Sequence, residues 1–345
     1  MKKVSSILLS LVLLLACVLP AFAVEGDLKT ALCAKSDSFG AYKHVFILGV
    51  DGAGSYFQKA KTPNFDRIFA KGAVDYTARA EVYSDSGPNW GSILTGVSFL
   101  KTLYTNGNIS PEGEEKPEGF HMRKYPTIFG EVHKAFPDAA LASYSNWENI
   151  NFGIIEDDIG VQKFYGNTDE LVTKEICAYL DAGNQPTLFF SQFGSVDDVG
   201  HALGSDSKEY VKQIEIVDGY LGEIYKAIAR NGLLKDSLII VVADHGHRAE
   251  GGHGRFSMRE SMATLAVAGK TVVSGSGLDK HTRNRDVSAI ALYALGICKP
   301  LRMSARLPGN LFADTCGELR PVLCDPLDAI VSPVMWLYTL STAEN

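Results

Sequence analysis

The sequence contains six aspartate and histidine residues whose types and spacing fit metal binding: Asp51, Asp197, His201, Asp244, His245 and His253. Carboxylate and imidazole ligands without a thiolate favour zinc, ahead of manganese or iron. Six such ligands are too many for one zinc ion and enough for two, with other divalent metals as alternatives. Each residue alone is explained as simply by a helix cap or a polar niche in the core, but all six together favour a metal centre.

Two metal ions roughly 3.5–4 Å apart can activate an attacking oxygen and stabilise a leaving oxygen in phosphoryl transfer. Residues 84–96 read SDSGPNWGSILTG and offer Ser86 as the attacking oxygen, because a bound metal lowers the pKa of a serine hydroxyl. The sequence predicts a helix that starts at Pro88, and the free N–H groups at a helix start favour an anion. Ser86 can also serve as a cap of this helix. The two roles are compatible, and the local sequence does not separate them.

Apolar runs alternate with amphipathic segments along the chain. They predict buried strands at residues 44–50, 187–192, 237–243 and 265–268, and helices at residues 63–70, 207–230 and 286–295. Thr62 is expected to cap the first of these helices. The alternation indicates an α/β fold whose mostly parallel central sheet is covered by helices on both faces. Ligands bind outside the carboxyl ends of such strands. Asp51, Asp197 and Asp244 each follow a predicted strand, so we expect them to meet at that edge.

The motifs that carry these residues occur in a recognisable order. They are VDG at Asp51, TPNFD from Thr62, SGPNWGSILTG from Ser86, VDDVGH ending at His201, ADHG around Asp244 and GHG around His253. This ordered set resembles the alkaline phosphatase superfamily and, within it, the type I phosphodiesterase/nucleotide pyrophosphatase branch, over about residues 43–300. The resemblance implies a three-layer α/β/α sandwich, formed by a single catalytic domain across residues 24–345.

The resemblance also implies roles for individual residues. One zinc ion would be held by Asp197, His201 and His253, and the other by Asp51, Asp244 and His245. Ser86 would contact metal as the nucleophile and form a phosphoserine intermediate. Asn89 would contact a phosphoryl oxygen. His247 and His281 are alternatives to His253 as the last ligand.

Some residues depart from the pattern of the superfamily. The phosphodiesterase branch usually has a threonine nucleophile, whereas Ser86 after Asp85 is closer to the alkaline phosphatases themselves. Those phosphatases carry a glutamate for a third metal five residues before the first zinc aspartate, and Gln192 stands there. A neutral amide is a poor ligand for magnesium, so we expect two metals. Residues 87–90 also lack the pattern from which sulfatases form their aldehyde nucleophile.

The resemblance therefore predicts an exported two-metal hydrolase of small phosphate esters, without assigning monoesters or diesters. The alternative is a non-enzymatic metal-binding or recognition protein on a retained hydrolase scaffold. The formal net charge of −7 argues against a nucleic-acid-binding module, because such modules rely on basic surfaces.

The N-terminus has the pattern of a signal peptide. Lys2 and Lys3 precede an apolar run at residues 7–15, and small residues at 21–23 form a cleavage site. We expect cleavage of residues 1–23 and a secreted or periplasmic protein, with lipid attachment at Cys17 as the alternative. No later segment is long and apolar enough to predict a transmembrane helix.

Residues 100–165 are rich in Gly, Pro and Tyr and are expected to form a cap or irregular insertion beside the site. Candidates for contact with an organic substituent are aromatic, with core packing as the alternative for each: Trp90, Tyr104, Tyr125 and Trp147. Cys316 and Cys324 lie close enough in sequence for a disulfide in an oxidising compartment.

Overall fold

A computed structural model describes residues 36–111, 123–275, 278 and 282–313 of the 345-residue chain. Within these residues the structure has one seven-stranded sheet with the strand order β2-β7-β6-β1-β5-β3-β4. The strands are β1 His44–Val50, β2 Ala73–Arg79, β3 Leu141–Ser145, β4 Gln162–Tyr165, β5 Leu188–Phe193, β6 Ser237–Ala243 and β7 Met262–Ala268.

The sheet is parallel through its centre and antiparallel at one edge. β1 pairs in parallel with β5 and with β6, and β3 pairs in parallel with β5 and β4. β7 runs antiparallel to both β6 and β2. Every residue of β1 is buried, with Val45 and Ile47 in one hydrophobic core and Phe46 and Leu48 in the other. A continuous apolar run is therefore the pattern of a strand that is covered on both faces.

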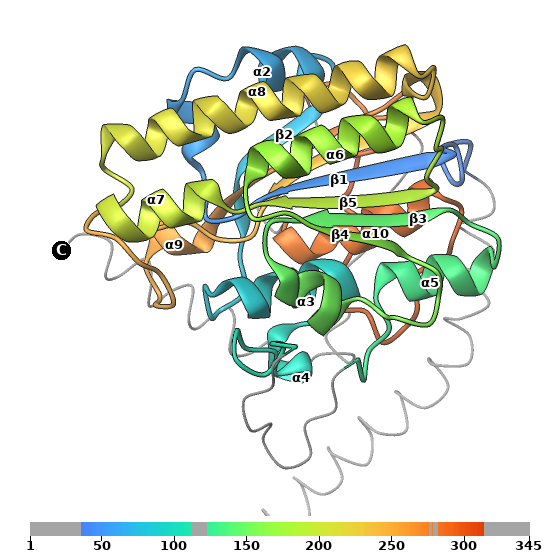
Figure 1. Ribbon diagram of the computed structural model, residues 1–345. Helices are drawn as coiled ribbons and strands as arrows, with labels where there is room; N and C mark the ends of the chain where they lie inside the picture. Colours follow the sequence, from blue (N-terminus) through green and yellow to red (C-terminus); the bar gives the residue numbers. More distant parts are fainter. Residues whose placement is uncertain (1–35, 112–122, 276–277, 279–281, 314–345) are drawn as a thin grey trace, which may run out of the picture.

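Helices cover the two faces of the sheet (Figure 1). One face carries α2 Pro63–Phe69, α6 Asp169–Asp181 and α8 Lys208–Arg230. The other face carries α3 Ser86–Thr95, α5 Ile128–Ala135 and α10 Val287–Ala294. α7 Ser195–Leu203 follows β5 and packs against α8. The shorter helical segments are η1 Tyr56–Lys59, α4 Phe99–Thr102, η2 Ile150–Ile154, η3 Leu234–Asp236, α9 Met258–Ser261 and η4 Asn284–Asp286. The predicted three-layer α/β/α sandwich with a mostly parallel sheet is confirmed.

The start of α2 shows how distant segments fix a local structure. Thr62 occupies the N-cap position as predicted, but its side chain makes no capping hydrogen bond. The carboxylate of Asp218 in α8 accepts hydrogen bonds from the backbone N–H groups of Asn64, at 3.0 Å, and Phe65, at 2.7 Å. The free N–H groups of this helix are thus satisfied by a residue that the local sequence does not contain.

The predicted cap at residues 100–165 is wrong for most of that range. β3 and β4 belong to the central sheet, and α5 packs on one of its faces. β3 reads LASYS and is fully buried. Ser143 and Ser145 interrupt the continuous apolar run that usually indicates a buried strand. Among the described residues of this range, the ones that border the site are Asn106, Gly107, Ser110, Asn146, Trp147 and Asn149.

Several sequence predictions lie outside the described residues. These are the signal peptide at 1–23, the lipid site at Cys17, the ligand alternative His281 and the disulfide between Cys316 and Cys324. In the part of the chain that the structure describes, no helix combines the length and apolar character needed to cross a membrane.

Candidate metal centre and nucleophile

Three predicted site residues meet where the two central strands end. Asp51 follows β1, and Asp244 and His245 follow β6. The parallel register pairs Val50 with Ala243, so these residues leave the sheet side by side. Nε2 of His245 lies 3.3 Å from Oδ2 of Asp244 and 3.5 Å from Oδ1 of Asp51. Sheet geometry alone therefore brings a buried cluster of three possible metal ligands together.

Ser86 joins this buried cluster from the opposite side. Its hydroxyl donates a hydrogen bond to Oδ1 of Asp51, at 3.2 Å, and lies 3.1 Å from Nε2 of His245. α3 begins at Ser86 itself, two residues before the predicted start, and its N-cap position belongs to Asp85. The Ser86 hydroxyl thus contacts two possible metal ligands instead of capping the helix with its side chain. Its role as a nucleophile stays a prediction.

A second cluster forms between α7 and the loop after β6. Asp197 and His201 lie one turn apart on α7, with Nε2 of His201 3.3 Å from Oδ2 of Asp197. Nε2 of His253 lies 3.0 Å from Nε2 of His201 and 3.4 Å from Oδ1 of Asp197. This cluster is more open than the first, because the His201 side chain is 52% exposed. The structure therefore brings together all three residues predicted for one metal ion.

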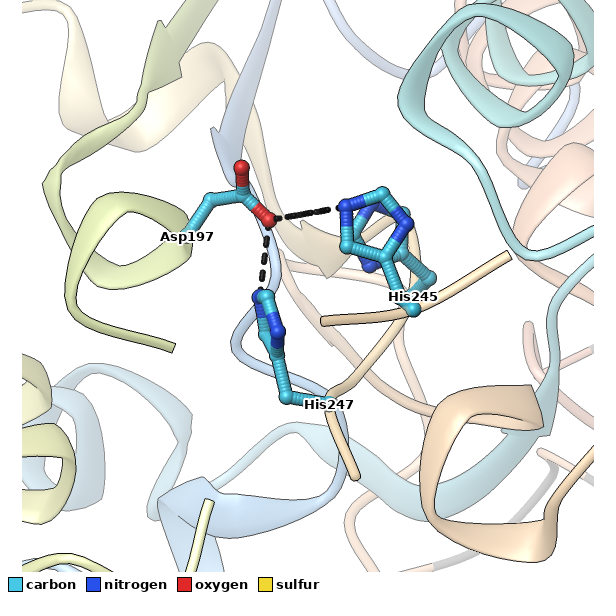
Figure 2. Close-up of side chains that lie close together, drawn as sticks. Asp197, His245 and His247 are labelled. Atoms are coloured by element: carbon cyan, nitrogen blue, oxygen red, sulfur yellow. Dashed lines mark hydrogen bonds and ion pairs between the residues drawn. The ribbon is translucent and has the colours of Figure 1, made fainter. Parts of the chain in front are cut away.

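His247 is a fourth imidazole in the same place. Its Nε2 lies 2.8 Å from Oδ1 of Asp197, and Figure 2 shows Asp197 reaching from α7 toward both His245 and His247. A Cβ atom would come within 2.7 Å of the His247 ring at Gly52 and within 2.3 Å at Gly200, so these glycines make room for the ring. His247 was predicted as an alternative to His253; the structure places both imidazoles beside Asp197.

Two groups of potential ligand atoms that suit divalent metal ions share His245, and the second of them contains His247 but not His201. Potential ligand atoms lie within 4.8 Å of one another in two groups: Asp197 with His245, His247 and His253, and Asp51 with Asp244 and His245. Oδ2 of Asp244 is buried and accepts no hydrogen bond. Oxygen and imidazole donors without sulfur fit zinc, with manganese and iron as alternatives.

The electrostatics of the cluster also favour a cation. Burial raises the pKa of Asp51 well above its ordinary value, and the charges of Asp244 and Asp197 raise it further. Burial, followed by repulsion from Asp197, raises the pKa of Asp244 to about 8. Burial opposes ionisation of Asp197 as well, but hydrogen bonds with His201 and His247 outweigh it and lower that pKa. Divalent cations would compensate this crowding of carboxylates, so the donor set fits the predicted metals.

The two buried histidines are held in the state that metals require. Burial lowers the pKa of His245, and the neighbouring His253 lowers it further. Burial also lowers the pKa of His247. Both rings are therefore neutral at neutral pH, and a neutral imidazole is the form that binds a metal.

The second carboxylate oxygen of Asp51 is held away from Ser86. Oδ2 accepts hydrogen bonds from Nε1 of Trp90, at 2.8 Å, and from Nε2 of Gln192, at 2.9 Å. Oε1 of Gln192 in turn accepts from the backbone N–H groups of Asn146 and Trp147. Two neutral donors thus fix Asp51 so that Oδ1 is the oxygen that faces the nucleophile.

The structure does not support the predicted contact between Asn89 and a phosphoryl oxygen. Oδ1 of Asn89 accepts hydrogen bonds from the backbone of Glu81 and the side chain of Asn284, both at 2.8 Å. Its Nδ2 donates to the backbone oxygens of Tyr83 and Asp85. All the hydrogen-bonding capacity of this fully buried amide is used inside the protein, so Asn89 is a structural residue behind the start of α3.

A fully buried ion pair lies next to Asn89. Oε1 of Glu81 is 2.7 Å from Nη1 of Arg285, and both side chains are 0% exposed. Oε2 of Glu81 accepts hydrogen bonds from the Ser98 hydroxyl and the Phe99 backbone N–H. This pair connects the segments on either side of α3 to the segment before α10.

A cavity of about 510 Å³ opens beside the two clusters. Its lining is mostly polar: Asp51, Ser86, Asn106, Gly107, Ser110, Asn146, Trp147, Asn149, Gln192, Gly194, Asp197, Asp198, His201 and His253. Of the four aromatic candidates, Trp147 lines this cavity, whereas Trp90 and Tyr104 are buried in the core and Tyr125 is not part of the lining. The predicted contact with substrate therefore remains open for Trp147.

Asn106 is a cavity residue that the sequence did not reveal. Its Oδ1 accepts a hydrogen bond of 2.7 Å from the backbone N–H of Gly87, directly after the nucleophile. The Asn106–Gly107 dipeptide indicates a turn, but nothing in the local sequence connects that turn to Ser86.

The three-layer sandwich, with a serine at a helix start beside Asp/His clusters at the carboxyl edge of its sheet, agrees with the predicted alkaline phosphatase superfamily. A sequence profile of the type I phosphodiesterase / nucleotide pyrophosphatase family matches residues 45–262, more than half of the chain. The chain belongs to this family.

The chain is similar to two kinds of protein: GPI ethanolamine phosphate transferases and ectonucleotide pyrophosphatases/phosphodiesterases. The GPI ethanolamine phosphate transferase 2 of Aspergillus fumigatus is 23% identical over 240 residues, which cover 66% of this chain and 30% of that protein. The ectonucleotide pyrophosphatase/phosphodiesterase family member 3 of Rattus norvegicus is 22% identical over 218 residues, covering 59% and 24%. The chain thus spans less than a third of either relative.

The fold is shared with solved structures. Murine ectonucleotide pyrophosphatase/phosphodiesterase 5, in an inactive form in complex with AMP, superposes with a TM-score of 0.58 at 15% identity. The match covers 75% of this chain and 96% of that chain.

Proposed function

We propose that this protein is an exported, metal-dependent hydrolase of small phosphate esters that uses Ser86 as its nucleophile. The observation that carries the proposal is the position of the Ser86 hydroxyl, which touches Asp51 and His245 inside a polar cavity and caps no helix. Membership of a phosphodiesterase family supports the same reaction class.

The residues of the two clusters divide the metal binding between them. Asp51, Asp244 and His245 would hold one ion next to Ser86, and Asp197, His201 and His253 would hold the other. Bound metals would lower the pKa of an attacking oxygen and stabilise the charge of a leaving one. We propose zinc in both positions.

Ser86 performs the covalent step. Its Oγ forms a bond to phosphorus while the bond from phosphorus to the ester oxygen breaks, and the serine proton ends on the departing alcohol. Water then displaces Oγ from phosphorus, which restores the hydroxyl and releases the phosphate product. The N-terminus of α3, where Ser86 is the first residue, favours the negative phosphoryl group through its free N–H groups.

Transfer to an alcohol is the second candidate reaction. It is favoured by the names of the fungal relatives, which are ethanolamine phosphate transferases. If an alcohol replaces water in the second step, the covalent serine intermediate yields a new phosphate ester. The product is a monoester when the first substrate is a monoester, and a diester when the first substrate is a diester whose remaining ester group stays on phosphorus. Product analysis by phosphorus NMR, with and without an added alcohol such as ethanolamine or glycerol, separates the two reactions.

The nucleophile is tested by Ser86→Ala, with Ser92→Ala as its control. Ser92 lies in the same helix, is fully buried, and its hydroxyl has no hydrogen-bond partner, so its removal leaves the site intact. We expect Ser86→Ala to lose most turnover of monoester and diester chromogenic substrates while its zinc content and Tm stay close to those of Ser92→Ala. A retained kcat in Ser86→Ala would refute the role of Ser86. Wild-type protein that binds zinc but turns over none of these substrates would favour the non-enzymatic alternative.

Export is part of the proposal and rests on the leader. Mass spectrometry of protein recovered from an expressing bacterium distinguishes a chain that starts at Val24 from one that is lipid-modified at Cys17. A chain that retains Met1 in the cytoplasm would contradict export.

A further inference from the structure

The segment before the nucleophile holds the loop that carries the last ligand. Ser84 Oγ accepts a hydrogen bond of 3.0 Å from the backbone N–H of Gly254 and donates one of 2.8 Å to the backbone oxygen of Arg255. Oδ1 of Asp85 lies 3.0 Å from Nδ1 of His253. Two consecutive residues before Ser86 therefore contact three consecutive residues of this loop.

The contact with Asp85 determines which ring nitrogen of His253 faces the second cluster. With Nδ1 facing the Asp85 carboxylate, Nε2 points at His201 and Asp197, at 3.0 and 3.4 Å. The His253 side chain is 5% exposed, so water has little access to either nitrogen. A carboxylate oxygen 3.0 Å from Nδ1 favours the tautomer that carries its proton on Nδ1, and this tautomer leaves the Nε2 lone pair for a metal.

Two features show that the carboxylate serves this contact. Asp85 occupies the N-cap position of α3, but its side chain makes no capping hydrogen bond. At Gly254, φ is +89° and a Cβ atom would lie 2.7 Å from Oδ1 of Asp85, so a glycine is needed for the loop to approach. Asp85 is not among the residues that line the cavity.

We propose that Asp85 is a positioning residue that orients the His253 imidazole for metal binding and thereby couples the nucleophile segment to the second cluster. This inference rests on the proposed metal-dependent function. Losing such an outer partner of a ligating histidine typically lowers metal affinity by about 10–100-fold.

The test measures zinc affinity of the chelator-stripped full-length mature protein by competition with a chromogenic chelator. Asp85→Ala should weaken the binding of one zinc ion by about 10–100-fold and leave the other unchanged. Asp85→Asn keeps a neutral acceptor and should recover part of the loss. Ser84→Ala removes the neighbouring loop contacts but not the carboxylate, so its zinc affinity should stay near that of wild type.

A double-mutant cycle separates orientation of His253 from a general structural effect. In a His253→Ala background, Asp85→Ala should have no further effect on zinc affinity. Asp85→Ala with affinity within twofold of wild type, or with an equal loss in both backgrounds, would overturn the inference. Nitrogen-15 NMR of the His253 ring gives an independent readout, because the Nδ1–H tautomer should dominate in wild type and be lost in Asp85→Ala.

The two proposals fail in different ways. Wild-type protein that binds two zinc ions but turns over no phosphate ester would refute the hydrolase and leave the Asp85 result standing. Ser86-dependent turnover with an unchanged zinc affinity in Asp85→Ala would refute the inference alone.

Discussion

The two metal clusters are built on different parts of the fold. Asp51, Asp244 and His245 follow two adjacent central strands, and their side chains are between 0 and 4% exposed. Asp197 and His201 belong to helix α7, while His253 belongs to a loop with glycines at 251, 252 and 254. The first cluster is set by the register of the sheet. The second depends on side chains such as Asp85 and His247 that hold its members in place.

This difference indicates that the two clusters have different roles in the proposed reaction. The strand-end cluster is buried and contacts Ser86, the proposed nucleophile, so it suits the covalent step. The α7 cluster opens on the cavity through the exposed His201 and can admit water or another acceptor. Mutations in the first cluster should therefore act on the bond-forming step, and mutations around the second should act on metal affinity.

The largest expected effect is a difference in kcat between variants of the two clusters. Asp244→Ala removes a ligand and also the acceptor for the backbone N–H groups of Gly52 and His245. We expect kcat to fall by at least the 10²–10³ or so typical of losing one group that stabilises charge in the transition state. His201→Ala should cost about 10-fold to 100-fold, because water can replace an exposed ligand. Equal losses in kcat for the two variants would contradict the comparison.

The second prediction concerns the support of Asp51. Gln192→Leu removes one of the two N–H donors to a buried carboxylate oxygen, which should cost about 1–3 kcal/mol of unfolding free energy in the metal-free chain. Urea unfolding measures this loss. The control is Gln162→Leu on β4, where an exposed glutamine donates to the hydroxyl of Tyr144. A Gln192 variant as stable as the control would show that the hydrogen bond from Trp90 is enough to stabilise the Asp51 carboxylate.

A third prediction sharpens the role of His247. His247→Ala removes the contact with Asp197 and should lower the affinity for one zinc ion by about 10-fold. His247→Gln can still donate an N–H to Asp197, so it should retain most of the zinc affinity. Zinc competition measures both variants. Complete loss of one zinc ion in both would instead make His247 a ligand.

The last prediction is a pH dependence of the stability of the metal-free chain. Asp244, whose pKa is raised to about 8, and Asp51, whose pKa is also raised by burial, are protonated more readily in the folded state. Stability from such groups is fully present below the unfolded pKa and is lost as the pH rises toward the folded pKa. The contribution of Asp51 and Asp244 to the free energy of unfolding therefore falls as the pH rises.

The histidines determine the pH range in which the fall in stability due to Asp51 and Asp244 is not offset by other groups. The pKa of His201 is raised by its hydrogen bond with Asp197, so its contribution also falls above the ordinary value of 6.5. The lowered pKa values of His245 and His247 act in the opposite direction, but only below 6.5. Between pH 6.5 and about 8, the chelator-treated protein should lose up to about 1.4 kcal/mol per pH unit for each proton released. Thermal unfolding should show this slope without zinc, and a flat profile without zinc would contradict it.

The sequence predicted the strand-end half of the site better than its surroundings. Continuous apolar runs mark β1 and β6, and the residue after each strand is then placed by sheet geometry, so Asp51 and Asp244 could be expected to meet. β3 and β4 were missed because serines and a short polar edge strand interrupt the apolar pattern. Asn106 and Asp85 take their roles from tertiary contacts with residues 19 or more positions away, and local sequence carries no signal of such contacts.

The order in which the chain is synthesised matters for the ion pair between Glu81 and Arg285. Its members are 204 positions apart, and the bond from Asn284 to Asn89 spans 195 positions. Contacts of such sequence separation form late, after the loops between them have closed. A chain that ends before Asn284 would leave Glu81 charged and unpaired in the core, at a cost of about 3–5 kcal/mol. Helix α3, which begins at Ser86, therefore acquires these contacts only when nearly the whole domain is present, and an unfinished chain holds the proposed nucleophile without them.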